Sequence, residues 1–303
     1  MSEALTSAPA RISLSALRVS SAAVICCLTL SALGCGTGEA SGGGERGNES
    51  TGSLLVLGAS DLLAAFDELV PLYESRTGER VELVLGSTGN LSAQIRHGAP
   101  ADLFFSANAA FLDGLIDAGR IDPGSRSIYA VGRLAAVAPP GSDPPAHPSE
   151  LRDPRFRTIA IANPEHAPYG WAAREALRSL GLWEELRERI VMGENVAHAL
   201  QFVRTGNADA GIVALSLVRG EFGESVPHRV VDDALHPPML QVAGIVSGSN
   251  RPGQARAFLE FVLSPDGQEI LARYGFEPPP SEVAASPGAA APLSSHDGRV
   301  QRN

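Results

Sequence analysis

The chain has 303 residues and a formal net charge of −10, and all 24 of its Lys and Arg positions are Arg. The lack of Lys excludes Schiff-base catalysis, a pyridoxal-phosphate lysine and a P-loop lysine, and the acidic balance argues against nucleic acid as a partner. The three cysteines, Cys26, Cys27 and Cys35, lie close to the N-terminus, so the rest of the chain is predicted to contain no disulfide, thiol nucleophile or cysteine-based metal site.

Residues 1–35 have the order of a secretory signal peptide, in which two arginines precede an apolar run and Cys35 follows it. The apolar run, residues 22–33, is too short to span a bilayer as a permanent helix. The ending Leu-Ser-Ala-Leu-Gly-Cys resembles the lipobox of bacterial lipoproteins, which would make Cys35 the lipidated residue. Because Ala32 stands where a Leu is usual, secretion without an anchor is the alternative. We therefore expect the protein in the periplasm or on the outer face of a bacterial membrane.

Two further segments have compositions that do not support a packed core. Residues 36–53 are rich in Gly, Ser and Glu and are predicted to form a flexible linker. Residues 278–303 are rich in Pro, Ala and Ser and are predicted to form a disordered tail. The body between them, about 225 residues, is long enough for one large or two modest domains.

The first part of the body alternates between apolar runs and segments with apolar residues at helical spacing. The runs predict strands at residues 54–57, 81–85 and 101–106, and an amphipathic helix is predicted after each strand. Uninterrupted apolar strands that alternate with helices are typical of a parallel sheet covered on both faces.

A long strand-like run at residues 128–137 and a proline-rich loop at 139–148 are interpreted as the crossover into a second lobe. The same alternation then predicts strands at residues 158–162, 190–192 and 209–215.

The last part of the body is expected to return to the first lobe. It contains a predicted strand at residues 239–246 and two helices with Pro in the first turn, at 252–263 and 265–274. The predicted fold class is therefore α/β with two lobes, each a mainly parallel sheet flanked by helices. Lobe 1 would comprise residues 54–131 and 239–277, lobe 2 would comprise residues 132–238, and two strands would form the hinge.

A predicted strand or loop turns into a helix at four places, at residues 58–60, 86–90, 168–170 and 194–196. In an open α/β sheet, ligands bind beyond the carboxyl ends of the strands, so we expect the four turns to converge on one cleft. A helix N-terminus carries roughly +0.5 charge, so four of them would offer about +2 without any Arg. Surroundings that only donate hydrogen bonds favour a fully deprotonated oxyanion. The alternative for residues 86–89 is a plain N-cap with a flexible approach.

Five segments together carry a family resemblance. They read GAS at 58–60, GSTGNLSAQIRHGAPADLFFSA at 86–107, NPEHAPYGWAAREAL at 163–177, GENVAHALQFVRTGNADAGIVALS at 193–216 and FLEFVLSPDGQEILARYGF at 258–276. This combination resembles the molybdate-binding proteins of bacterial ABC transporters, over essentially all of residues 54–276.

The resemblance implies a type II periplasmic binding fold, without enzymatic activity or cofactor, that closes on molybdate or tungstate and delivers it to a membrane ABC permease. Molybdenum would enter only as the oxyanion, and we expect the protein to act as a monomer. By matching position, the oxyanion would be bound by hydroxyl and backbone N–H donors of Ser60 and Thr88, with Ser87 alongside, and by backbone N–H groups of Tyr169 and Val196. Asp61 and Asn195 would support these residues.

The chain departs from the family pattern at two positions. Many members have a Tyr hydroxyl donor where this chain has Ala214, although one branch reads VALS there as this chain does. Asp61 stands where that branch can use Asn. We expect the Asp61 side chain to face away from the cleft and to complement its helix N-terminus. If it pointed inward, it would repel a dianion or favour a protonated one such as phosphate.

Two alternative functions remain at this stage. One is a binding protein for another oxyanion, such as sulfate, phosphate or phosphonate. The other is a secreted serine hydrolase that uses Ser60 or Ser87 with a histidine, although no G-x-S-x-G elbow occurs in the body. The histidines show no metal-ligand spacing, and His166 is interpreted as a hydrogen-bonded loop residue. Tyr169 is interpreted either as part of a lid or as a packing residue.

Overall fold

The structure is a computed structural model that describes residues 52–220 and 225–280. The predictions for the signal peptide, for lipidation of Cys35, for the linker up to residue 51 and for the tail from residue 281 lie outside these residues. Within the described ranges, no helix is both long and apolar enough to cross a membrane.

The first sheet has five strands in the described part of the chain, in the order β2-β1-β3-β10-β4. These strands are β1 (Leu54–Ala59), β2 (Val81–Gly86), β3 (Leu103–Ser106), β4 (Ser127–Gly132) and β10 (Met239–Ile245). Strand β1 is parallel to β2 and β3, whereas β10 runs antiparallel to β3 and β4. Its helices are α1 (Leu63–Thr77), α2 (Thr88–Arg96), α3 (Ala109–Asp117), α8 (Pro252–Leu263) and α9 (Pro265–Arg273).

The second sheet, counted over the same residues, also has five strands, in the order β7-β6-β8-β5-β9. They are β5 (Leu134–Val137), β6 (Ile159–Ala162), β7 (Ile190–Gly193), β8 (Ala210–Ala214) and β9 (His228–Val230). The helices here are α4 (Pro168–Ser179), α5 (Trp183–Leu186), α6 (Val196–Arg204) and α7 (Leu215–Val218). Single turns of 3₁₀ helix occur at η1 (Ser60–Leu62), η2 (Pro123–Ser125), η3 (Pro148–Arg152), η4 (Arg187–Arg189) and η5 (Asp233–Leu235).

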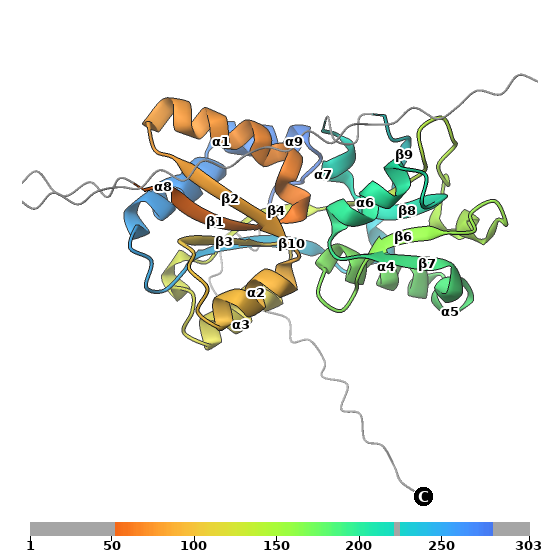
Figure 1. The fold of residues 1–303 in the computed structure, drawn as a ribbon, viewed down its shortest axis with the longest axis horizontal. Coiled ribbons are helices and arrows are strands. Elements are labelled where there is room, and N and C mark those ends of the chain that lie inside the picture. Colours follow the sequence, from red (N-terminus) through yellow and green to blue (C-terminus); the bar gives the residue numbers. More distant parts are fainter. Residues whose placement is uncertain (1–51, 221–224, 281–303) are drawn as a thin grey trace, which may run out of the picture. The chain divides into compact units, whose positions relative to one another are not determined.

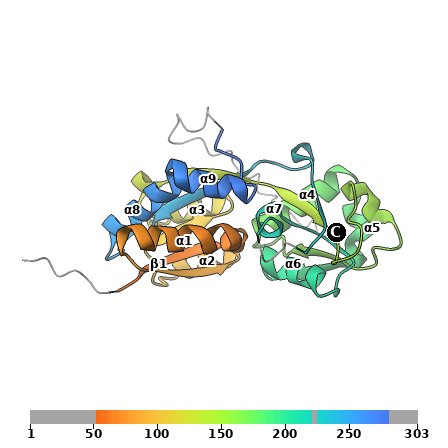
Figure 2. The same ribbon diagram turned by 90° about the horizontal axis from the view of Figure 1, so that it is seen from above.

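Both sheets repeat one plan, in which three parallel strands are followed by a strand of opposite direction, β10 in the first and β5 in the second. Helices cover both faces of each sheet, with α1, α8 and α9 on one face of the first sheet and α2 and α3 on the other (Figures 1 and 2). Buried apolar clusters fill the spaces between helices and sheets, and one of them centres on edge-to-face contacts among Phe66, Phe105 and Phe258. The predicted two-lobed α/β fold is confirmed.

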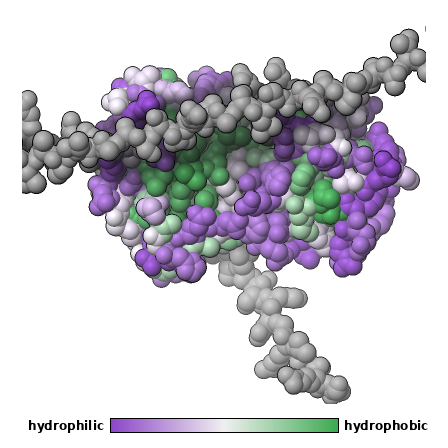
Figure 3. Space-filling view, in the orientation of Figure 1, coloured by the Kyte–Doolittle hydropathy of each residue, from purple (hydrophilic) through white to green (hydrophobic). Residues whose placement is uncertain are grey.

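The edge strands β2 and β7 each expose a large apolar side chain, Val84 and Met192, which are 40% and 47% exposed. Figure 3 shows hydrophobic surface on the face that carries β2. Both strands end at turns that lead into helices, at Gly86 and Gly193. The surface beside these two turns is therefore partly apolar.

The apolar run at residues 128–137 is not one strand, as the sequence suggests, but two strands in different sheets. Strand β4 ends at Gly132 and β5 begins at Leu134, so the chain changes sheets at Arg133. A Cβ atom at Gly132 would collide with the Tyr169 hydroxyl and would lie 2.5 Å from Gln241 Nε2. Arg133 forms ion pairs of 2.8 Å with Asp233 and 3.0 Å with Glu277. Hydrophobic periodicity does not reveal this break because both strands are buried.

Candidate functional site

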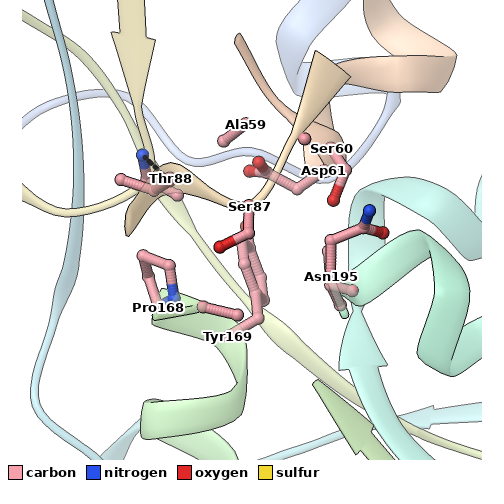
Figure 4. Close-up of a pocket in the computed structure, with 12 residues that line it drawn as sticks. Ala59, Ser60, Asp61, Ser87, Thr88, Pro168, Tyr169 and Asn195 are labelled. Carbon is pink, nitrogen blue, oxygen red and sulfur yellow. Dashed lines mark hydrogen bonds between the residues drawn. The ribbon is translucent and has the colours of Figure 1, made fainter. Parts of the chain in front are cut away.

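A small cavity lies where the four predicted turns meet, and it encloses about 190 Å³, part of which is open to solvent. The cavity is too small for a drug-sized ligand, which favours a small ion. No Arg, Lys or His is among the residues of the described chain that line it. All seven residues predicted from the sequence line this cavity (Figure 4), namely Ser60, Asp61, Ser87, Thr88, Tyr169, Asn195 and Val196.

The sheet topology explains why these residues meet. Strands β1 and β2 are parallel neighbours, and their carboxyl ends, Ala59 and Gly86, are paired in the sheet. Strands β6 and β7 are likewise parallel neighbours, and Ala162 pairs with Gly193 at their carboxyl ends. Turns that follow the ends of neighbouring parallel strands lie at the same edge of a sheet. Each sheet therefore contributes two of the four turns.

The N-termini of α2 and α4 have no side-chain cap. Their N-cap residues, Ser87 and Ala167, make no capping hydrogen bond to the first turn. Because Pro168 has no N–H, the first amide donor of α4 is that of Tyr169. The first amides of an α-helix have no partner within the helix. These two helix ends can therefore donate hydrogen bonds to an anion in the cavity.

The N-terminus of α6 differs because Asn195 caps it. Asn195 Oδ1 accepts a hydrogen bond of 2.9 Å from the His198 amide. This bond fixes the start of the helix at Val196. The Val196 amide lies before the His198 amide that Asn195 caps. Asn195 therefore holds the Val196 turn in place.

The Thr88 hydroxyl is fixed by the neighbouring strand. The amide of Ala107, which follows β3, donates a hydrogen bond of 3.2 Å to Thr88 Oγ1. Thr88 is 1% exposed, so little water reaches this hydroxyl. A hydroxyl that accepts one hydrogen bond still has its proton to donate. Thr88 is therefore prepared to donate to a ligand.

Ser87 lines the cavity but directs its hydroxyl across it to the second lobe. Ser87 Oγ donates a hydrogen bond of 2.6 Å to the His166 carbonyl and lies 2.8 Å from His166 Nδ1. The Gly89 amide donates to the same carbonyl over 2.8 Å. A Cβ atom at Gly89 would lie 2.7 Å from the His166 oxygen, so only Gly permits this approach. The turn at residues 86–90 and the loop at 163–167 thus form a direct contact between the lobes.

This contact also bears on the hydrolase alternative. A serine nucleophile must give its proton to a base such as an imidazole. The proton of Ser87 is instead directed to a backbone carbonyl, and His166 Nδ1 is then left to donate to Ser87 Oγ. In the described part of the chain, no group of three or more His, Cys, Asp or Glu residues could hold a metal ion. The geometry of the Ser87–His166 pair therefore does not activate the hydroxyl.

Asp61 is a correction to the sequence analysis, because its side chain does not face away from the cleft. It is 0% exposed and lines the cavity, and neither of its carboxylate oxygens makes a hydrogen bond of regular geometry with a described residue. Burial raises its pKa to about 7, and the Tyr169 hydroxyl acts in the opposite direction. The expectation is wrong because Ser60 to Leu62 form a separate 3₁₀ turn before α1, so Asp61 does not occupy an exposed first turn of that helix.

The Tyr169 side chain belongs to a buried polar network between the lobes. Gln241 Nε2 on β10 donates to the Tyr169 hydroxyl over 3.3 Å, and the Tyr129 hydroxyl on β4 donates to Gln241 Oε1 over 3.1 Å. Burial is the main reason why the pKa values of both phenols lie well above their ordinary value. Tyr169 is 2% exposed, so it packs rather than forming a lid.

Comparisons with known proteins add a second line of information. The family described as bacterial extracellular solute-binding protein matches residues 54–277. The molybdate-binding protein ModA of Rhodobacter capsulatus is 32% identical over 233 residues, which cover 75% of this chain and 89% of that protein. ModA of Azotobacter vinelandii is 34% identical over 224 residues, which cover 72% and 87%. The solved periplasmic molybdate-binding protein of Azotobacter vinelandii is similar with a TM-score of 0.70 and 31% identity, covering 75% of this chain and 100% of that one.

Proposed function

We propose, since this chain belongs to the bacterial extracellular solute-binding protein family, that it captures molybdate outside the cytoplasm and delivers it to an ABC permease. The observation that supports this most strongly is a small cavity, lined by four turns from two lobes, that contains hydrogen-bond donors and no cationic side chain among the described residues. Such a site suits a small tetrahedral dianion. The proposed role of this site is binding.

In the proposed complex, each turn contributes neutral donors. Ser60 and Thr88 donate through hydroxyl and backbone N–H groups, and Tyr169 and Val196 donate through backbone N–H groups. Ser87 lines the cavity while its hydroxyl joins the lobes through His166. The N-termini of α2, α4 and α6 add partial positive charge, roughly +0.5 each, which offsets most of the charge of a dianion without an ion pair.

The proposed capture step is closure of the two lobes around the anion. The contacts of Ser87 and Gly89 with His166 support it, since they join the lobes beside the cavity. Tungstate has the same charge and shape and is proposed as a second ligand. We further propose that a signal peptide exports the protein, that Cys35 anchors it by a lipid on the outer face of the membrane, and that it acts as a monomer.

Thermal melting in the presence of separate anions tests the proposed function. A ligand that binds the folded state raises the melting temperature by mass action, by about 2.7 kcal/mol of stability at a concentration of 100 Kd. We expect millimolar molybdate and tungstate to raise the melting temperature of the purified body, residues 52–280, and sulfate and phosphate to raise it less. A body that melts at the same temperature with and without molybdate would contradict the proposal.

A second oxyanion function deserves the same experiment because of Asp61. A carboxylate inside the cavity can accept a hydrogen bond from an oxyanion that carries a proton, such as hydrogen phosphate. If phosphate stabilises the protein more than molybdate does, this second function is favoured.

A further inference from the structure

Asp61 places an ionisable group inside a cavity that otherwise suits a dianion. Its side chain is 0% exposed, and neither of its two oxygens makes a hydrogen bond of regular geometry within the described ranges, although the Tyr169 hydroxyl is close enough to affect its pKa. Figure 4 shows the carboxylate among the lining residues, on the side of Ser87 and Thr88. The backbone is held as well, because Ser216 Oγ of α7 donates a hydrogen bond of 2.7 Å to the Asp61 carbonyl. The backbone that carries the carboxyl group is therefore fixed in place.

The groups that face Asp61 do not neutralise a negative charge. The Tyr169 phenol on α4 faces the Asp61 carboxyl group, and the Tyr129 phenol on β4 lies beyond Tyr169. Both phenols are neutral donors. The turn that carries Asp61 also packs against α1, α6, α7 and β2. The charged side chains of these elements have other contacts: Glu68 contacts Arg273 and Tyr274, Glu74 contacts Arg80, Arg76 contacts Asp266, Glu82 contacts Ser53, Arg204 contacts Gln201, and the His198 ring accepts from the Glu194 amide. Tyr73 of α1 packs against Phe258, and Asp67 of α1 has an interaction of its own.

A dianion beside an ionised Asp61 would therefore meet an uncompensated like charge in a water-poor site. Two like charges in close contact disfavour the ionised form of the group that can accept a proton. A fully deprotonated tetrahedral oxyanion has no proton to give, so the proton has to come from solvent. Once protonated, the carboxyl group has one O–H donor, which matches the acceptor-only oxygens of the anion.

We propose that Asp61 takes up one proton from solvent when the oxyanion binds, and that the resulting acid O–H donates a hydrogen bond to the anion. This inference rests on the proposed function and adds that anion binding is coupled to protonation of Asp61. The complex then contains one dianion, one neutral Asp61 and neutral hydroxyl and amide donors. Asp61 thereby makes anion capture dependent on pH and selects oxyanions that have only acceptors.

The direction of the pH dependence follows from linkage. In the empty cavity, burial raises the pKa of Asp61 to about 7, so the acid form is already present at pH 6 and is scarce at pH 8.5. Binding must then be accompanied by protonation above pH 7, and the affinity should fall about tenfold for each further pH unit. Between pH 6 and pH 8.5, the expected loss of affinity is about thirty-fold.

Isothermal titration calorimetry of the full-length protein with sodium molybdate measures both effects. At pH 8, titrations in buffers of different ionisation enthalpy give the number of protons exchanged. We expect uptake of about one proton per molybdate by the unchanged protein and none by Asp61→Asn, whose amide keeps a donor without titrating. The Asn variant should bind with nearly constant affinity between pH 6 and pH 8.5. Asp117→Asn, at an exposed position of α3, is the matched control and should behave like the unchanged protein.

The outcomes separate this inference from the proposed function. Molybdate binding without proton uptake at pH 8, or equal uptake by Asp61→Asn, would overturn the inference and leave the function intact. Absence of molybdate binding by the unchanged protein at pH 6 would overturn the function itself. Tight phosphate binding without proton exchange, together with weak molybdate binding, would show that the Asp61 carboxylate accepts a hydrogen bond from a protonated ligand, and would overturn both. If Asp61→Asn fails to fold, the proton count of the unchanged protein still decides.

Discussion

Thr88 shows how one hydroxyl can serve the fold and the ligand at once. It accepts from the Ala107 amide and keeps its proton for the cavity. We predict that Thr88→Ala weakens molybdate binding by about 1–3 kcal/mol, the usual value of a hydrogen bond to a charged group. Thr88→Ser, which keeps the hydroxyl, should retain most of the affinity. Calorimetry of both variants provides the comparison, and equal affinity of Thr88→Ala and the unchanged protein would show that this hydroxyl does not contact the anion.

Asp61 should also affect stability in the absence of any anion. Its pKa in the folded state, about 7, lies above the ordinary value of 3.8, so between these values the folded protein holds the extra proton. Its contribution to stability is therefore complete below about pH 4, is lost as the pH rises to about 7, and stays lost above. We predict that Asp61→Asn melts at a higher temperature than the unchanged protein at pH 8 and that this difference shrinks toward pH 4. A difference that does not vary with pH would contradict the burial of an ionisable Asp61.

The residues that line the cavity could be predicted from the sequence, but their hydrogen bonds could not. The change from loop to helix marks the four turns, and the resemblance to molybdate-binding proteins selects Ser60, Thr88, Tyr169 and Val196 within them. The hydrogen bonds between Ser87 and His166 join residues 79 positions apart, and no local sequence pattern predicts them. The orientation of Asp61 was predicted wrongly because it depends on a 3₁₀ turn that hydrophobic periodicity does not distinguish from the start of α1.

At the scale of elements, the N-terminus of α2 depends on close approach to the second lobe. The nearest atoms to a Cβ at Gly89 all belong to His166, the closest at 2.7 Å. We predict that Gly89→Ala weakens molybdate binding by roughly tenfold or more, since overpacking costs about 1–3 kcal/mol and would prevent full closure. The melting temperature of the anion-free protein should change little, because the added methyl group meets only the other lobe.

Gly253 offers a matched control for this variant. It is also the second residue of a helix, α8, and a Cβ there would meet nothing within 4 Å. Gly253→Ala should therefore bind molybdate as the unchanged protein does. If Gly89→Ala and Gly253→Ala bind equally well in calorimetry, the contact with His166 is not part of anion capture.

The crossing between the sheets shows what sequence patterns miss at this scale. Apolar runs predicted nearly every strand, because buried parallel strands are uniformly hydrophobic. The same apolar pattern predicted β4 and β5 as a single strand. The feature that separates the two strands is the space that Gly132 leaves for the Tyr169 hydroxyl. That space depends on a helix that begins 36 residues later, which a local window does not contain.

At the scale of the whole body, residues 52–280, the fold repeats one sheet plan twice and brings the ends of four parallel strands to one cavity. This arrangement could be predicted because the alternation of strands and helices fixes the edge at which turns gather. The resemblance to molybdate-binding proteins supplied the ligand, which the alternation alone does not identify.

The central claim is that neutral donors from both lobes hold one tetrahedral dianion between them. A crystal structure of the body with molybdate, with anomalous data collected at the molybdenum absorption edge, tests it most directly. We predict a single strong anomalous peak in the cavity, with the oxyanion within hydrogen-bond distance of Ser60, Thr88, Tyr169 and Val196. A peak at another place, or an Arg side chain in contact with the anion, would contradict this claim.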